Sequence, residues 1–262
     1  MALFVVATPI GNLDEASSRM KQVLVEADLV LCEDTRRTRT LYAALDLVAP
    51  RLMSCHAHNE SNRLHTVIER LKDGEMIALV SDAGMPGISD PGGRIVEAAH
   101  AHSIDVHVVS GPSSVIAAIA ASGFPSTPFH FLGFPPRKAG AVRKMIEDAS
   151  HLEGPFVLLE SGRRVGALIA VLAELLPGRE AVMCRELTKQ YEEITRGDLT
   201  AMSTEPQRGE VVLVVGPGQP VVGSEVEVGP DLKTIASALA ERWECSKRDA
   251  YNALLALEND RK

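Results

Sequence analysis

The chain lacks the features that mark several common classes of protein. Its 262 residues include only four cysteines, Cys32, Cys55, Cys184 and Cys245, which have neither the paired spacing of a metal site nor that of a disulfide framework. We therefore expect free thiols in a reducing compartment. No apolar run approaches the ~20 residues that span a bilayer. No basic segment followed by an apolar stretch and a cleavage site opens the chain. These absences predict a cytoplasmic protein with no membrane partner and no metal.

Aromatic residues and positive charge are also scarce. Aromatic residues make up 4% of the chain, so the core must depend on Val, Leu, Ile and Ala. The formal net charge of -8 argues against a protein that binds polyanions without specificity. It does not exclude nucleic acid, because a local basic face can operate on an acidic protein. The motifs G-x-G-x-x-G and G-x-x-x-x-G-K-[ST] are both missing, so the sequence does not support a conventional NAD fingerprint and argues against a Walker-type ATPase.

Short apolar runs alternate with helical patterns along the first half of the chain. We expect strands over residues 3–7, 28–32, 52–55, 76–80 and 105–109, and helices over 15–26, 36–45, 60–72, 94–102 and 115–121. Asn59 is expected to cap the third of these helices. Repeated strand–helix pairs of this kind predict a mostly parallel sheet with both faces covered.

The composition changes after residue 122. Residues 123–140 contain four prolines and three glycines, which predicts a linker between a first α/β domain, 1–122, and a second, 141–218. In the second domain we expect strands over 156–160 and 181–185, a helix over 165–176, and an antiparallel pair over 193–196 and 210–215. This pair implies a mixed sheet. Residues 219–262 indicate a polar tether with helices over 231–241 and 247–258.

The strongest functional signal is the segment 79–92, Leu-Val-Ser-Asp-Ala-Gly-Met-Pro-Gly-Ile-Ser-Asp-Pro-Gly. An apolar run ends there in a loop of small and turn-forming residues. In a parallel sheet such a loop opens at the carboxyl edge, where open α/β folds bind ligands. The glycines permit close approach of a backbone, and Asp82 and Asp90 supply carboxylates. The segment therefore predicts a small-molecule site.

Several short motifs, in this order, resemble those of a known family. They are Thr8-Pro9-Ile10-Gly11-Asn12-Leu13, Glu33-Asp34-Thr35-Arg36, His56-Ala57-His58-Asn59-Glu60, Ser81-Asp82-Ala83-Gly84-Met85-Pro86, Gly111-Pro112-Ser113, Gly133-Phe134 with Pro136-Arg137-Lys138, and Arg185-Glu186-Leu187-Thr188-Lys189. From Leu3 to about Val215 the chain resembles the small-subunit ribosomal RNA methyltransferases that act on a cytidine ribose 2′-oxygen. That family lies within the tetrapyrrole-methylase (class III S-adenosylmethionine) superfamily. The chain departs from the family pattern at Ala57, where Glu is usual, and at Gly162-Arg163, where Pro-His is usual.

The resemblance implies an α/β fold of two α/β/α domains, with mostly parallel and then mixed sheets, and a small C-terminal helical segment. It also implies a homodimer, and S-adenosylmethionine folded in the cleft between the domains. The cofactor-binding residues would be Ile10, Gly11, Asp82, Ala83, Gly84, Gly87, Ile88, Ser113, Ser114, Val115, Leu159 and Leu187. Helix capping is the alternative role for Ser113 and Ser114, and a place in the core is the alternative for Leu159 and Leu187.

Basic residues on two segments are candidates for RNA contacts. Arg36, Arg37 and Arg39 lie beside Glu33 and Asp34, and this spacing fits either a structural ion-pair cluster or a grip on RNA phosphates. Arg137 and Lys138 lie beside the predicted cleft and join them as RNA-binding candidates. His56 and His58 alternate, so a strand would send them to opposite faces.

Methyl transfer to a ribose hydroxyl requires alignment of the reacting atoms and loss of the hydroxyl proton. The candidate catalytic residues are Glu33, Asp34, Glu186 and Lys189, and Asp90 is a further candidate base. A lysine serves as a base only if its pKa is depressed. For Glu186 and Lys189 the alternative is an ion pair that fixes the loop.

We therefore expect S-adenosylmethionine-dependent 2′-O-methylation of a cytidine in small-subunit (16S) ribosomal RNA, either as free RNA or in the assembled small subunit. One alternative is methylation of a tetrapyrrole or another small acceptor on the same fold. The other is a noncatalytic RNA-binding protein of ribosome assembly. The arginine-rich loop favours RNA over a small acceptor, and the small residues of the cofactor loops disfavour a pure binding protein.

Overall fold

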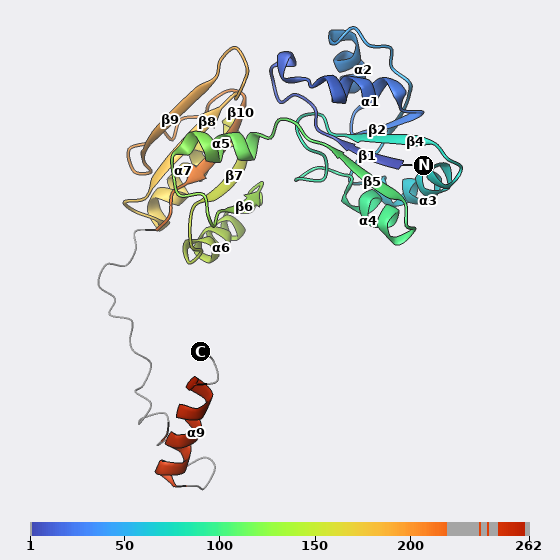
Figure 1. The fold of residues 1–262 in the computed structure, drawn as a ribbon. Coiled ribbons are helices and arrows are strands. Elements are labelled where there is room, and N and C mark those ends of the chain that lie inside the picture. The colour runs from blue at the N-terminus through green and yellow to red at the C-terminus, as the bar shows by residue number, and fades with distance from the viewer. Residues whose placement is uncertain (1, 219–235, 237–239, 241–245, 260–262) are drawn as a thin grey trace. The chain divides into compact units, whose positions relative to one another are not determined.

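The computed structural model describes residues 2–218, 236, 240 and 246–259. It divides into a unit of Met1–Gly218 and a unit of Gln219–Lys262. Within the described part of the chain, no helix combines the length and the apolar character needed to cross a membrane. The first unit contains two five-stranded sheets (Figure 1).

The first sheet is entirely parallel, as the alternating pattern predicts. Its strands lie in the order β3-β2-β4-β1-β5. They are β1 Ala2–Val6, β2 Leu29–Cys32, β3 Arg51–Ser54, β4 Met76–Val80 and β5 Asp105–Val109. Because all five run in one direction, the loops that follow them open at the same edge of the sheet.

Helices cover both faces of this sheet (Figure 1). Helices α1 Ser18–Glu26 and α2 Thr35–Ala44 pack on one face, and α3 Glu60–Lys72 and α4 Gly93–Ala101 on the other. Strand residues alternate between the two cores, since Leu29 and Leu31 join the α3–α4 cluster while Val30 and Cys32 join the α1–α2 cluster. Helix α1 begins at Ser18, later than expected, because the Ser17 hydroxyl caps it by accepting from the Met20 amide at 3.1 Å. A short 3-10 helix, η1 Leu13–Glu15, precedes it.

The second sheet is mixed, in the order β6-β7-β10-β8-β9. Its strands are β6 His130–Gly133, β7 Phe156–Ser161, β8 Glu180–Arg185, β9 Glu193–Asp198 and β10 Glu210–Val215. Only the β6–β7 pair is parallel. Helix α5 Ser114–Ser122 packs on one face, and α6 Ala139–Ser150 and α7 Gly162–Leu175 pack on the other. Both sheets are therefore α/β/α layers, which confirms the expected fold class.

The stretch expected to be a linker, 123–140, holds secondary structure. It contains β6 and the start of α6. Helix α5 already packs on the second sheet, because Val115, Ala118 and Ile119 share a cluster with Val182 and Val214. The chain thus passes from one sheet to the other before α5. The prolines and glycines mark the turns around a short edge strand, a position that tolerates them.

The antiparallel pair expected between 193–196 and 210–215 is wrong. Strand β8 lies between β9 and β10 and pairs with both. Burial explains the order, since Val211–Val215 of β10 are buried on both faces, whereas the first four residues of β9 are exposed. An apolar strand belongs in the middle of a sheet and a polar one at its edge.

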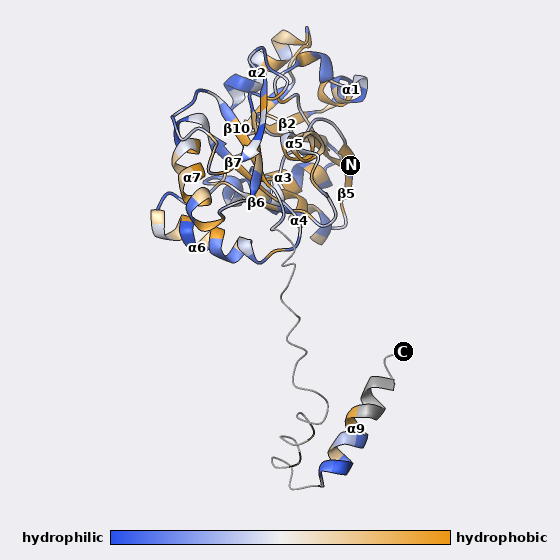
Figure 2. Cartoon of the chain, turned by 90° about the vertical axis from the view of Figure 1, so that its left-hand side faces the viewer, coloured by the Kyte–Doolittle hydropathy of each residue, from blue (hydrophilic) through white to orange (hydrophobic). Residues whose placement is uncertain are grey.

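The second unit contains helix α9 Lys247–Asn259, which confirms the helix expected over 247–258. Its first residues, Lys247-Arg248-Asp249, are hydrophilic (Figure 2). The helix expected over 231–241 lies outside the described residues, which include only Ala236 and Ala240 of that range.

Candidate functional site

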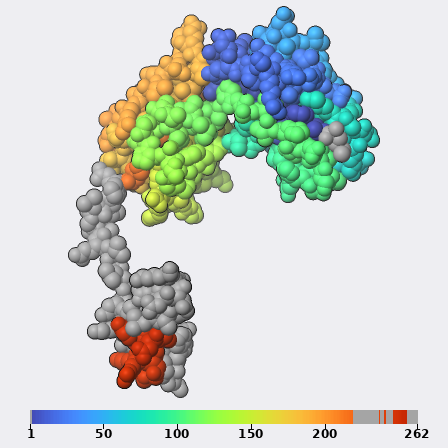
Figure 3. Space-filling model, in the orientation of Figure 1, coloured from blue at the N-terminus to red at the C-terminus, as the bar shows by residue number. Residues whose placement is uncertain are grey.

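The loops that follow the strands of the first sheet meet the second sheet around a cavity of about 990 Å³. The space-filling view shows the surface hollowed between the part of the first unit that contains the first sheet and the part that contains the second (Figure 3). Of the residues predicted from the sequence, the cavity is lined by Ile10, Glu33, Asp34, Arg36, Arg37, Asp82, Ala83, Gly84, Ile88, Asp90, Ser113, Ser114, Val115, Leu159, Leu187 and Lys189. Within the described residues, the predicted site residues that lie outside this lining are Gly11, Gly87, Arg39, Arg137, Lys138 and Glu186.

Gly11 lies outside the cavity lining and permits a close contact between the loop after β1 and the segment after β8. A Cβ at Gly11 would lie 2.5 Å from Lys189 Cγ, 2.7 Å from Thr188 Oγ1 and 3.0 Å from the Leu187 carbonyl oxygen. The neighbouring Asn12 amide donates to Thr188 Oγ1 at 3.1 Å. A side chain at this position would force the loop after β1 and the segment after β8 to shift apart.

The loop after β4 is held against the loop after β1. The Thr8 and Gly84 backbones exchange two hydrogen bonds, with N···O distances of 2.9 and 3.0 Å. The fully buried Thr8 donates its hydroxyl to the Ser81 carbonyl at 3.3 Å, and the Ser81 hydroxyl donates to the Gly84 carbonyl at 3.1 Å. Gly84 has a φ of +82°, a conformation that favours glycine. At Ala83 and Gly84 the loop therefore presents mainly backbone to the cavity.

The histidine-containing motif acts as a scaffold for this same loop. Asn59 does not cap α3 with its side chain. Its amide group instead accepts from the His56 amide at 2.8 Å and donates to the Ser54 carbonyl at 3.2 Å. Glu60 is 7% exposed, and its Oε1 accepts from the Gly92 and Arg94 amides, each at 3.0 Å. A carboxylate at the start of α4 satisfies free amides and favours the helix dipole.

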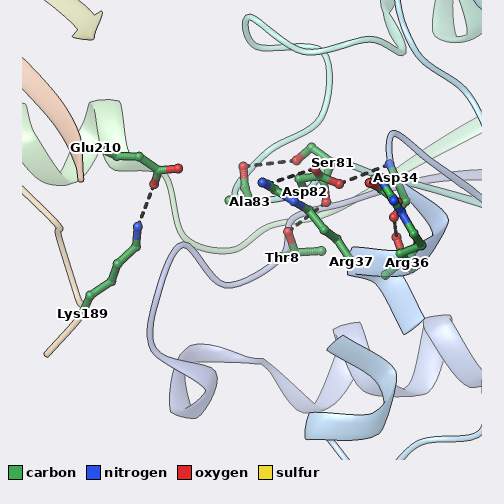
Figure 4. Close-up of polar contacts among 10 residues, drawn as sticks. Thr8, Asp34, Arg36, Arg37, Ser81, Asp82, Ala83, Lys189 and Glu210 are labelled. Atoms are coloured by element: carbon green, nitrogen blue, oxygen red, sulfur yellow. Dashed lines mark hydrogen bonds and ion pairs between the residues drawn. The ribbon is translucent and has the colours of Figure 1, made fainter. Parts of the chain in front are cut away.

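Two carboxylates at the cavity are paired with arginines (Figure 4). Arg36 forms a bidentate pair with Asp34, with Nη2···Oδ2 at 2.7 Å and Nε···Oδ1 at 3.1 Å. Arg37 Nη1 lies 3.2 Å from Asp82 Oδ2. Hydrogen bonds from Arg36 hold the pKa of Asp34 well below its usual range. Asp34 is therefore a weak base. Arg36 and Arg37 are each already paired with a carboxylate of the protein, so an RNA phosphate would have to compete with that carboxylate.

Asp90 has the opposite electrostatic character. Burial, and then the negative charges of Glu33 and Asp82, raise the pKa of Asp90 to about 6. It lines the cavity beside Ser89. A desolvated carboxylate with a pKa near the working pH is a suitable general base.

The Arg-Glu-Leu-Thr-Lys motif forms an ion-pair cluster at the opposite wall. Lys189 Nζ lies 3.0 Å from Glu186 Oε1 and 2.7 Å from Glu210 Oε2, the second pair being visible in Figure 4. Partial burial lowers the pKa of Lys189, but hydrogen bonds to Glu210 and Glu186 outweigh it and raise the pKa above its ordinary value. A hydrogen bond from the Glu210 amide, followed by that from Lys189, lowers the pKa of Glu186. Lys189 is therefore protonated and cannot accept a proton in this arrangement.

The remaining wall is apolar and carries the start of a helix. Val115, Leu159, Leu187 and Val212 line it, and all four belong to the cluster between α5 and the second sheet. Ser113 caps α5 through a long contact of 3.5 Å from the Ile116 amide to its hydroxyl. Leu159 and Leu187 therefore both pack in the core and line the cavity, and Ser113 both caps α5 and lines the cavity.

Sequence reasoning missed other lining residues. They are Thr35, Ser54, His56, His58, Met85, Ser89, Phe134, Glu160, Ser161, Cys184, Glu210, Val211 and Val212. His56 and His58 lie in a turn after β3, with ring centroids 6.1 Å apart, so both reach the cavity and the opposite faces expected of a strand do not apply. His56, His58 and Phe134 belong to motifs quoted above, so the sequence could have indicated that they line the site. Glu210, Val211 and Val212 of β10 belong to no such motif.

No cluster of three or more His, Cys, Asp or Glu side chains suited to a metal ion occurs among the described residues. The described cysteines, Cys32, Cys55 and Cys184, are free and buried. Burial raises the pKa of each thiol, so they are inert at neutral pH.

Comparison with known proteins decides the family. The sequence model of the family described as Tetrapyrrole (Corrin/Porphyrin) Methylases matches residues 2–203. The chain belongs to this family. Among its relatives is the ribosomal RNA small subunit methyltransferase I of Leptospira biflexa, 43% identical over 192 residues, which cover 73% of this chain and 80% of the relative. The protein of the same name from Pseudomonas aeruginosa is 40% identical over 246 residues, covering 91% of this chain and 87% of the relative.

Solved structures with low sequence identity share the fold. A diphthine synthase has a TM-score of 0.63 at 16% identity, covering 82% of this chain and 89% of that one. The uroporphyrin-III C-methyl transferase of Thermus thermophilus, complexed with S-adenyl homocysteine, has a TM-score of 0.56 at 18% identity, covering 82% and 96%. The two-sheet architecture is therefore that of the family.

Glu60 provides a test of the scaffold. Glu60→Ala leaves the Gly92 and Arg94 amides without their buried acceptor, and we expect the free energy of unfolding to fall by about 1–3 kcal/mol. Chemical denaturation measures this change. Glu69→Ala on the same helix, where the side chain is 52% exposed, is the matched control and should stay within about 0.5 kcal/mol of wild type. Equal unfolding midpoints for the Glu60 variant and wild type would contradict the role.

Proposed function

We propose that this protein transfers the methyl group of S-adenosylmethionine to the ribose 2′-oxygen of a cytidine in small-subunit ribosomal RNA. The observation that carries the proposal is the cavity at which the family's loops from both sheets meet, in a chain 40% identical over 246 residues to a ribosomal RNA small subunit methyltransferase I. The same relatives favour RNA over a tetrapyrrole or another small acceptor.

The cavity residues fit S-adenosylmethionine. The Ala83–Gly84 backbone admits close approach, and the apolar wall of Leu159, Leu187 and Val212 suits a flat base. The start of α5 at Ser113 offers free amides to an anionic group. Carboxylates on the other side attract the cationic parts of the molecule. When bound, this cofactor supplies an electrophilic methyl group on a good leaving group, and alignment and proton removal are left to the protein.

We assign the proton-accepting role to Asp90. Its burial among cavity residues and its raised pKa make it a stronger base than Asp34, whose pKa is depressed. Glu33, which also lines the cavity, helps to set the pKa of Asp90 through its charge. Lys189, protonated and held by Glu186 and Glu210, positions the ribose or its phosphate rather than accepting a proton.

The RNA partner would be gripped by cations beside the cavity. Arg36 and Arg37 are exposed but already paired. Arg39, Arg137 and Lys138 form no ion pair with any residue that the structure describes, and all three are exposed. The cytoplasm is the location that fits a ribosomal substrate. A homodimer is part of the same proposal, and the mass of the protein in solution by light scattering tests it.

The function is tested with small-subunit RNA and with assembled subunits from a strain that lacks this gene. Purified protein with S-adenosylmethionine should methylate one cytidine at its 2′-oxygen, detected by blocked reverse transcription or by mass spectrometry. Methylation of a base atom, or none on either substrate, would contradict the proposal.

Binding titrations with the same RNA substrates at several salt concentrations examine the basic residues. Neutralising Arg36, Arg37, Arg39, Arg137 and Lys138 should weaken RNA binding and flatten its dependence on salt, by a slope of roughly one per lost phosphate contact, with cofactor affinity unchanged. Wild-type affinity and slope after all five changes would exclude this face as the RNA site.

The pH dependence tests Asp90. Single-turnover methyl transfer should rise with pH through about 6, as Asp90 ionises, and then level off. Asp90→Asn should slow the reaction by about 10²–10⁴-fold and remove that rise, while cofactor affinity stays near wild type.

The stability of the fold should fall as pH rises through the range in which the rate of methyl transfer increases. Because the folded-state pKa of Asp90 lies above the ordinary value of 3.8, its ionisation costs the fold stability as pH rises from 3.8 to about 6. The melting temperature of Asp90→Asn should therefore be above that of wild type at pH 7.5, with the difference lost below pH 3.8.

An unchanged single-turnover rate in Asp90→Asn would show that this residue takes no part in the chemistry.

A further inference from the structure

Phe134 differs from every other phenylalanine in this protein. It is 60% exposed and lines the cavity. The chain has six phenylalanines, and the other five lie in or pack against hydrophobic clusters. These are Phe4, Phe124, Phe129, Phe131 and Phe156. In a chain with so few aromatic residues, leaving one ring in solvent forgoes the free energy of burying it.

The backbone holds Phe134 in this exposed position. Strand β6 loses its register with β7 between Phe131 and Gly133, and Gly133 has a φ of +69°. Such an irregularity at a strand end redirects the next side chain. Pro135 and Pro136 follow at once and restrict the chain.

A buried carboxylate anchors the segment after Phe134. Arg164 Nη2 donates to the Pro135 and Pro136 carbonyls at 3.5 and 3.3 Å. It also lies 3.2 Å from Glu160 Oε2, and Glu160 is 5% exposed. The ring is therefore presented on a fixed support, which distinguishes it from an apolar side chain left at random on a surface.

The position of the ring relates it to the chemistry. A Cβ on Gly133 would lie 3.2 Å from Ser89 Oγ, so the segment that carries Phe134 touches the loop that carries Asp90. The exposed Arg137 and Lys138 follow a few residues later. An aromatic face with cations beside it is the arrangement with which proteins hold unstacked nucleotides.

We propose that Phe134 is the surface on which the target cytosine stacks when its ribose enters the cavity. The inference rests on the proposed function. A nucleotide in a helix must leave its stack to bring its ribose to an enclosed site, and an aromatic ring in the protein replaces the lost stacking. The cavity of about 990 Å³ lies at the upper end of the range that holds one small ligand, which leaves space for an acceptor beside the cofactor. Because every base has a π face, Phe134 supplies affinity and position, and base identity is read elsewhere.

The test compares three variants at this position in single-turnover methylation of the RNA substrate, with calorimetry of S-adenosylmethionine. Phe134→Ala should raise the enzyme concentration for half-maximal rate by about 5- to 150-fold. Phe134→Trp should behave like wild type because it keeps a π face. Phe134→Leu should behave like the alanine variant, since it restores apolar bulk alone. All three should bind the cofactor as wild type does.

Tyr191→Ala is the matched control, because Tyr191 is 69% exposed and is not among the residues that line the cavity. It should leave the half-saturation unchanged. Wild-type half-saturation in Phe134→Ala, or full rescue by leucine, overturns the stacking proposal alone. Lost cofactor affinity in Phe134→Ala also overturns it, by placing the ring against the cofactor. A wild-type protein that methylates no RNA overturns the proposed function, and this inference with it.

Discussion

The close approach of Gly11 to the segment Leu187–Lys189 is the contact on which the rest of the site depends. Each sheet has its own hydrophobic cores and its own covering helices. The cavity, however, needs both sheets, because Asp34, Asp82 and Asp90 come from loops of the first and the apolar wall of Leu159, Leu187 and Val212 comes from the second. A side chain at Gly11 would overlap Lys189 and Thr188 and reach the Leu187 carbonyl. The absence of one methyl group therefore sets the distance between the two walls.

Within this frame, charge pairing assigns different roles to similar side chains. Arg36 keeps Asp34 a weak base, whereas the pKa of Asp90 is raised by partial burial and by the nearby charges of Glu33 and Asp82. Lys189 stays protonated between Glu186 and Glu210. These differences are the basis for the proposal that Asp90 accepts the proton and that Lys189, on the opposite wall, holds an anion. The sequence alone made these residues equal candidates for the catalytic base, and only their surroundings in the structure distinguish them.

Much of the fold could be predicted from local patterns, and the failures have physical causes. Strands β4 and β5 and helix α3 have the expected bounds, because apolar runs and turn residues delimit them. The role of 123–140 was missed, since prolines around an edge strand resemble those of a linker. The order of β8, β9 and β10 depends on which strands are buried on both faces. The pattern of residues next to one another in the sequence does not show which strands will lie side by side. At the site, motif residues such as His56 and Phe134 could have been anticipated, whereas Glu210 and Val212 reach the cavity only through the strand order.

Cofactor affinity after enlargement of Gly11 tests the central claim most directly. Gly11→Val should push the loop after β1 away from Leu187–Lys189 while both sheets stay folded. Calorimetry should then show S-adenosylmethionine affinity reduced by about tenfold or more, a loss of at least about 1.4 kcal/mol, with a melting temperature near wild type. Gly197→Val is the control, because a Cβ there meets no atom within 4 Å. Wild-type affinity in a folded Gly11→Val protein would contradict the account.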